Sequence, residues 1–144
     1  DAHKGYLKGE LNEAPEGYLL NPLTMPSSPC LFAFDKRTGE LKANPDTCAE
    51  VIIADNCFAT VQELVENTIR VLNLNCSRLT AQRLEVLNAY NQAIKIAKIK
   101  DDKQCFEKLS ERWFGSKWPA YFTTRRLLLG SHAESYLASV HYDG

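Results

Sequence analysis

The chain has 144 residues and a mass of 16.2 kDa; 44% of the residues are hydrophobic, 24% are charged, and the formal net charge is −1. This length supports one hydrophobic core, so we expect a single domain over residues 1–144. The composition excludes a disordered tail and a strongly basic nucleic-acid binder, and no apolar run approaches the roughly 20 residues that a membrane span needs.

The first 46 residues are unfavourable for helices. Five of the six prolines of the chain lie here, and each removes a backbone donor and disfavours helical geometry in the residue before it. Within this part, LFAFDKRTGEL (31–41) predicts two short extended runs around a turn in which Gly39 takes a positive φ. We therefore expect residues 1–46 to form an irregular, Pro-rich cover that holds a short β-hairpin.

Helical periodicity begins at Thr47. Thr47 and Glu50 have the spacing of a capping box, which predicts the start of a short helix. Apolar residues then recur every three or four positions over residues 57–75 and again over residues 80–100. These two stretches predict two long amphipathic helices.

Capping and breaking residues predict three further helices. Asp101 and Asp102 are placed to cap a fourth helix, Pro119 to begin a fifth, and Gly130 to separate the fifth from a terminal helix. The predicted fold class is mostly α. It is a small bundle of four to six helices over residues 47–144, with the irregular amino-terminal segment covering it.

Cysteine usage suggests an exported protein. Five cysteines occur beside a single methionine, without the CxxC spacing of zinc or thioredoxin-type motifs. Such usage is typical of disulfides formed outside the cytosol, so we expect a secreted or periplasmic protein whose signal peptide has been removed. The alternative is a cytosolic protein with five reduced, buried cysteines.

Helix geometry restricts how these cysteines could pair. Cys57 and Cys76 bracket a predicted helix about 28 Å long, so they cannot bridge each other. An antiparallel return of the next helix would bring Cys105 level with Cys57, which predicts a Cys57–Cys105 disulfide; the alternative is a buried Cys105 thiol. Cys30 and Cys48 flank the predicted hairpin, and a Cys30–Cys48 disulfide would stabilise it by about 3 kcal/mol.

The chain opens with the residues DAHK. If Asp1 is the native amino terminus, its free amine, the amide nitrogens of Ala2 and His3 and the His3 imidazole supply a square-planar set for Cu(II) or Ni(II). These residues resemble the copper-binding amino terminus of serum albumin, and the resemblance covers Asp1, Ala2, His3 and Lys4 alone. It implies an incidental Cu or Ni site, and we expect no other cofactor.

Charge is distributed unevenly along the chain. Residues 1–66 carry 11 acidic and 5 basic side chains, whereas residues 95–126 carry 9 basic and 4 acidic ones. The basic part includes the aromatic stretch RWFGSKWPAYFTTRR, and arginine beside aromatic residues is typical of protein-binding surfaces. The predicted partner-binding residues are Arg112, Lys117, Trp118, Arg125 and Arg126. In the alternative interpretation the aromatic residues anchor the core and the charges are solvated.

No catalytic motif is present in the sequence. HExxH, GxSxG, a phosphate-binding glycine loop and a multi-histidine cluster are all absent, which favours a non-enzyme. We predict a secreted or periplasmic, disulfide-stapled protein of the inhibitor, immunity or effector type, whose partner is another protein rather than nucleic acid. Two alternatives stay open: a small secreted hydrolase that uses Cys30 with His132 or His141, and a carrier of a small apolar ligand.

Overall fold

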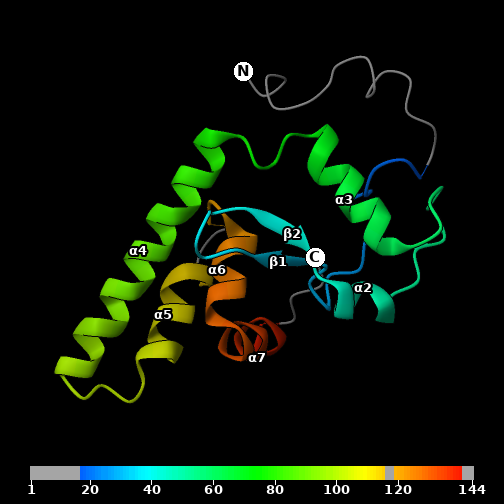
Figure 1. Ribbon diagram of the computed structural model, residues 1–144. Helices are drawn as coiled ribbons and strands as arrows, with labels where there is room; N and C mark the ends of the chain where they lie inside the picture. The colour runs from blue at the N-terminus through cyan, green and yellow to red at the C-terminus, as the bar shows by residue number, and fades with distance from the viewer. Residues whose placement is uncertain (1–16, 116–118, 141–144) are drawn as a thin grey trace. The chain divides into compact units, whose positions relative to one another are not determined.

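A computed structural model describes residues 17–115 and 119–140 of the chain (Figure 1). Within these residues it has six helices and one two-stranded antiparallel sheet, which confirms the predicted fold class. The elements in chain order are β1 (Phe32–Phe34), β2 (Leu41–Ala43), α2 (Pro45–Glu50), α3 (Val61–Val71), α4 (Ser77–Ile99), α5 (Cys105–Phe114), α6 (Phe122–Leu129) and α7 (Ser131–Ser139). The chain divides into two compact units, residues 1–80 and residues 81–144. The single domain stays a prediction.

The predicted hairpin forms in the first unit. β1 pairs antiparallel with β2, and Phe34 lies opposite Leu41. The connecting turn contains Gly39 at a φ of +81°, a conformation that glycine adopts without steric cost. The turn begins at Asp35, whose carboxylate accepts a hydrogen bond of 2.8 Å from the amide of Arg37. The hairpin and the role of Gly39 are therefore confirmed.

Side-chain hydrogen bonds attach the irregular segments of the first unit to helix α3. The buried Thr68 hydroxyl accepts a hydrogen bond from the amide of Leu20 at 2.9 Å and donates to the carbonyl of Leu64 at 2.8 Å. After α3, the Asn75 side chain accepts a hydrogen bond from the Leu41 amide and donates one to the Leu41 carbonyl, each at 2.8 Å. These contacts add to the apolar packing of Leu31, Met25 and Phe32 in the core of the first unit.

Helix α2 starts earlier than its sequence suggested. Asn44 is the N-cap, and its side chain accepts hydrogen bonds from the two amides at the start of the helix, while Pro45 occupies the first turn. Thr47 lies inside the helix and donates a hydrogen bond to the carbonyl of Cys30 at 2.8 Å. The predicted capping box of Thr47 and Glu50 is therefore wrong, because Asn44 performs the capping.

The second unit is a helical assembly built around α5. Helix α5 contacts both α6 and α7. Its buried Leu109 packs with Leu129 of α6 and Ala133 of α7, and aromatic side chains surround this cluster. Gly130, at a φ of +55°, separates α6 from α7 as predicted. Tyr121 also has a positive φ, so α6 begins after it and not at Pro119.

The structure contains no disulfide among the five cysteines, all of which lie in the described residues. The buried Cys48 thiol donates to the carbonyl of Leu31 at a sulfur–oxygen distance of 3.6 Å, and it belongs to the apolar core of the first unit. Cys57 is exposed, and Cys105 lines a cavity on α5. The predicted Cys30–Cys48 and Cys57–Cys105 disulfides are therefore wrong. No helix of the described ranges has both the length and the apolar character to cross a membrane.

Candidate functional site

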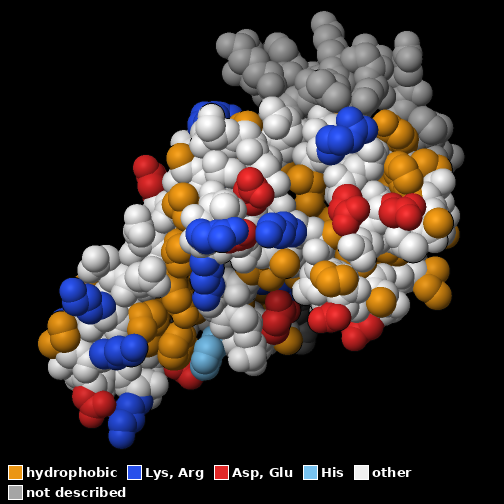
Figure 2. Space-filling view, viewed as in Figure 1, with side chains coloured by type: hydrophobic (Ala, Val, Ile, Leu, Met, Phe, Trp, Pro, Cys, Tyr) orange, Lys and Arg blue, Asp and Glu red, His pale blue; other side chains and the backbone are white. Residues whose placement is uncertain are grey.

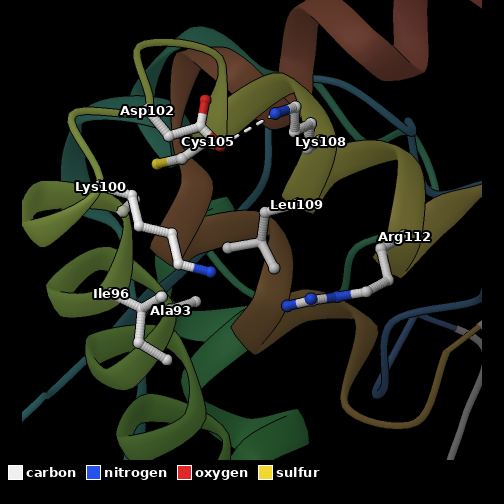
Figure 3. A pocket seen from close by; sticks show the side chains of 9 residues that line it. Ala93, Ile96, Lys100, Asp102, Cys105, Lys108, Leu109 and Arg112 are labelled. Atoms are coloured by element: carbon white, nitrogen blue, oxygen red, sulfur yellow. Dashed lines mark hydrogen bonds and ion pairs between the residues drawn. The ribbon is translucent and has the colours of Figure 1, made fainter.

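A cavity of about 220 Å³ lies in the second unit, between the carboxyl-terminal part of α4 and helix α5. We call it the basic cavity. It is lined by Ala93, Ile96, Ala97, Lys100, Asp102, Cys105, Lys108, Leu109 and Arg112. Figure 3 shows these side chains, with the helix α4 on one side and α5 on the other.

Helix periodicity places the lining residues. Ala93, Ile96, Ala97 and Lys100 follow the i, i+3, i+4, i+7 spacing of a single helix face, and so do the four residues that α5 contributes. Lys100 lies just beyond the end of α4, but its amide still donates to the carbonyl of Ile96 at 3.1 Å. Its side chain therefore stays in register with the α4 face.

Figure 2 shows Lys and Arg side chains mixed with hydrophobic ones over the carboxyl-terminal end of α4, at the lower left. The sequence of this end is IKIAKIK, residues 94–100. Ile96 and Ile99 are 51% and 77% exposed, beside the exposed Lys95, Lys98 and Lys100. The wall that α4 gives to the basic cavity is thus apolar, with cationic side chains at its edge.

Asp102 is the acidic side chain of the basic cavity. One of its oxygens accepts a hydrogen bond from the Lys108 ammonium at 3.0 Å, and the other accepts one from the amide of Gln104 at 3.0 Å. The hydrogen bond from Lys108 is the main cause of the lowered pKa of Asp102. The carboxylate is therefore ionised at neutral pH, and both of its oxygens are already engaged.

Two further cations reach the basic cavity from its two sides. Figure 3 shows the Lys100 ammonium and the Arg112 guanidinium extending towards each other from either side of Leu109. In residues 17–115 and 119–140, no carboxylate forms an ion pair with either of them. With Lys108 and Asp102 included, the cavity holds three cations and one anion, a net charge of +2. Such a site attracts anions.

Arg125 on α6 extends the basic character beyond the cavity. Its guanidinium carbon lies 4.7 Å from the centre of the Trp113 ring, and its Nε donates to the carbonyl of Ala120 at 2.9 Å. The pKa of Arg125 is lowered, first by burial and then by the nearby charge of Arg112. Two guanidinium groups are therefore close enough to repel each other, and an anion placed near both would relieve that repulsion.

The structure separates the predicted partner-binding residues. Arg112 lines the basic cavity and Arg125 lies over the ring of Trp113, but Arg126 is 5% exposed and forms a bidentate ion pair with Glu134 at 2.6 and 3.0 Å. Arg126 thus has an internal partner. The predicted residues Lys117, Trp118, Asp1, Ala2 and His3 lie outside the described residues.

Sequence reasoning missed Lys100 and Lys108 as members of a site. Both belong to the basic stretch 95–126, but we assigned that stretch's function to its aromatic part. Residues 93–100 and residues 105–112 each contain the i, i+3, i+4, i+7 spacing of one helix face. This spacing was the signal that could have marked Lys100 and Lys108 as members of the site. Only the packing of α4 against α5 shows that the two faces share one cavity.

The described residues offer no metal centre. No group of three or more His, Cys, Asp or Glu side chains in them could hold a metal ion. Among these residues histidine occurs once, at His132, whose ring stacks on Phe106 with 4.4 Å between the ring centres. His132 therefore has an aromatic partner on α5.

A curated protein from Escherichia coli is similar to the chain. Over 132 residues the chain is 30% identical to an Escherichia coli protein described as "Retron Ec83 putative HNH endonuclease". The alignment covers 90% of this chain and 50% of that protein, so the chain spans about half the length of the curated relative it matches. No protein-family model and no solved structure matches the chain.

This similarity overturns the predicted function. The relative's name describes an enzyme that acts on nucleic acid, whereas we predicted a secreted, disulfide-stapled inhibitor, immunity or effector protein. That prediction is wrong, and the Cys/His hydrolase and the apolar-ligand carrier are set aside for the same reason. The preference for a protein partner over nucleic acid is contradicted by the same similarity, because the relative's name describes an endonuclease. The near-zero net charge of the whole chain had concealed the basic residues 81–144. The secreted or periplasmic location stays a prediction.

Proposed function

We propose that this chain is part of an HNH-type endonuclease, and that its second unit binds the sugar–phosphate backbone of the nucleic acid through the basic cavity. The observation that carries the proposal is the convergence of Lys100, Lys108 and Arg112 on one cavity of net charge +2. The similarity to a retron endonuclease supplies the class of ligand.

The chemistry of the cavity matches phosphate recognition. A guanidinium group offers a planar pair of donors to phosphate oxygens, and an ammonium group adds a compact charge. Contacts of this kind position a nucleic acid without reading its sequence. The proposed role is therefore to hold the substrate in place, independently of base identity.

A metal-dependent cleavage centre does not fit the described residues. The letters HNH are the one-letter codes of histidine and asparagine, and the one described histidine, His132, stacks on Phe106. In residues 17–115 and 119–140 no cluster of potential ligands accompanies it. The basic cavity supplies binding and orientation, and we assign no bond-breaking step to it.

The test compares two double variants that remove the same charges from different places. Lys100→Ala/Arg112→Ala removes one lysine and one arginine from the cavity. Lys36→Ala/Arg37→Ala removes one of each from the exposed hairpin turn of the first unit. Binding of fluorescently labelled DNA and RNA is measured by anisotropy between about 50 and 200 mM salt, the range over which phosphate contacts weaken steeply.

The cavity variant should bind nucleic acid more weakly and with less salt dependence. Each lost phosphate contact lowers the slope of log K against log salt by about 0.9 on duplex DNA and about 0.7 on a single strand, so two lost contacts lower it by about twice as much. The turn variant should retain the parent slope. Equal slopes in the parent and the cavity variant would contradict the proposal, as would equal losses in both variants.

A further inference from the structure

The basic cavity has a small volume. Its volume is about 220 Å³, below the roughly 300 Å³ at which pockets for small molecules typically begin. It lies between two helices, with cations reaching in from both sides (Figure 3). A cavity of this volume accommodates a phosphate group with part of the sugar that carries it.

The charge of the cavity matches a terminal phosphate monoester better than an internal phosphodiester. An internal phosphodiester carries a single negative charge, whereas a phosphate monoester carries about −1.5 to −2 near pH 7 and presents three terminal oxygens. The cavity has a net charge of +2 and three separate cationic groups. A monoester would therefore neutralise the site, while a diester would leave about one positive charge unbalanced.

The donors are also arranged to reach several oxygens of one group. Lys100 and Arg112 line the same cavity and extend towards each other from either side of Leu109. Lys108 stands at the other end and keeps its ion pair with Asp102. The Arg112 guanidinium can hold two oxygens at once, and the Lys100 ammonium can hold the third.

The apolar lining fits the carbon atoms next to such a phosphate. Leu109, which is 3% exposed, and Ile96, which is 51% exposed, both line the cavity. Surfaces of this kind contact sugar carbons and offer no hydrogen bonds to a base edge. The lining thus favours a sequence-independent group.

From the volume, charge and donor arrangement together, we infer that the basic cavity binds the terminal phosphate monoester of a nucleic-acid strand in preference to an internal phosphodiester. The inference rests on the proposed function for the identity of the polymer. What the inference adds to the proposed function is that the second unit binds the phosphorylated ends of strands.

The test uses oligonucleotides of one sequence that differ only at their ends: 5′-phosphate, 3′-phosphate, or hydroxyl at both ends. One charge-assisted contact made to the monoester alone corresponds to about a tenfold preference for a phosphorylated end. Lys100→Ala/Arg112→Ala should abolish that preference, and Lys36→Ala/Arg37→Ala should retain it. A nucleoside monophosphate is titrated in parallel, since it carries the same group without a strand.

The outcomes separate this inference from the proposed function. Equal binding of phosphorylated and hydroxyl strands overturns the inference and leaves the proposed function standing. Failure of every oligonucleotide to bind overturns both. A preference that survives in the cavity variant places the phosphate elsewhere. A nucleoside monophosphate that fails to compete with the phosphorylated strand overturns the assignment of the cavity to the terminal phosphate.

Cys105 provides a second readout inside the cavity itself. Its thiol lines the cavity, and burial raises its pKa, so alkylation is followed under mildly alkaline conditions. A phosphorylated oligonucleotide should slow iodoacetamide labelling of Cys105, while the exposed Cys57 of the first unit labels at an unchanged rate. Peptide mass spectrometry measures both rates in one sample. Unprotected Cys105 at saturating ligand would contradict binding in the cavity.

Discussion

Arg125 and Arg126 are neighbours in sequence but have opposite roles. Successive residues of a helix point about 100° apart, so the two guanidinium groups leave α6 in different directions. Arg125 lies over the ring of Trp113 and close to Arg112, whereas Arg126 is buried against Glu134. The sequence shows two adjacent arginines, and the helix face decides that Arg125 stacks on Trp113 and that Arg126 is buried against Glu134.

Replacing Glu134 should lower the free energy of unfolding more than replacing its partner Arg126. The Arg126 side chain is 6% exposed and that of Glu134 is 45% exposed. Glu134→Ala leaves a buried guanidinium without its carboxylate and should cost about 2–3 kcal/mol of unfolding free energy. Arg126→Met preserves much of the buried volume and lets Glu134 return to water, so it should cost about 1 kcal/mol. Urea unfolding followed by circular dichroism measures both.

Glu85→Ala is the matched control for this experiment, since Glu85 is an exposed glutamate within α4. It should change stability by less than about 0.5 kcal/mol. A larger loss for Arg126→Met than for Glu134→Ala would show that packing of the arginine stem, rather than its charge, dominates at this position.

At the scale of elements, one side chain adds two hydrogen bonds to the apolar packing of the hairpin on α3. Asn75, in the segment between α3 and α4, makes two hydrogen bonds of 2.8 Å to the backbone of Leu41. Asn75→Ala removes both bonds and should lower the free energy of unfolding by about 1–3 kcal/mol. Asn75→Asp should be no better, because it loses the donor and places a carboxylate against the Leu41 carbonyl. Chemical unfolding of the two variants measures these losses.

Asn88→Ala serves as the reference for Asn75, because Asn88 is exposed on α4. Alanine is the better helix former, so this change should be neutral or stabilising by a few tenths of a kcal/mol. Parent-like stability of Asn75→Ala would show that the hairpin is held by its apolar contacts alone.

The sequence predicts the presence of elements that have a strong periodic pattern. It predicts the residues at which those elements begin and end less well. The hairpin, α4 and the break at Gly130 follow from alternation, helical spacing and glycine geometry. The start of α2 was missed because Asn44 precedes a proline, and the start of α6 because Tyr121 adopts a left-handed conformation. These outcomes depend on local hydrogen bonds and backbone strain that hydrophobic periodicity does not report.

The candidate site was predictable only in part. The sequence shows a basic segment and marks Arg112 and Arg125 as members of it. It does not show that Lys100 reaches the same space as Arg112, because that depends on how α4 packs against α5. The prediction of disulfides was wrong because it, too, depended on packing that the sequence does not show. The spacing of the cysteines permits a bridge, but the Cys48 thiol lies in an apolar core.

At the scale of the whole molecule, the two units carry opposite charge. Residues 1–80 contain 7 basic and 11 acidic side chains, a net of −4, and residues 81–144 contain 10 basic and 7 acidic ones, a net of +3. The first unit should repel a polyanion, while the second attracts it. Ultraviolet crosslinking of the full chain to nucleic acid, followed by peptide mapping, should therefore place adducts predominantly within residues 81–144.

Raising the salt concentration provides the control for crosslinking. Adducts that reflect backbone contacts should decrease together with binding, because phosphate contacts release counterions. Adducts concentrated in residues 17–80 would contradict the assignment of nucleic-acid binding to the second unit.

The two hydrogen bonds between Asn75 and Leu41 also affect whether the hairpin can pair with a strand of another molecule. A strand at the border of a sheet presents backbone groups that can recruit a strand of another molecule, which is a route to aggregation. β2 has only three residues, and the Asn75 amide occupies the donor and the acceptor of Leu41 that face away from β1. The hairpin is thereby closed to intermolecular strand pairing at this position, so one asparagine contributes to solubility as well as to the fold.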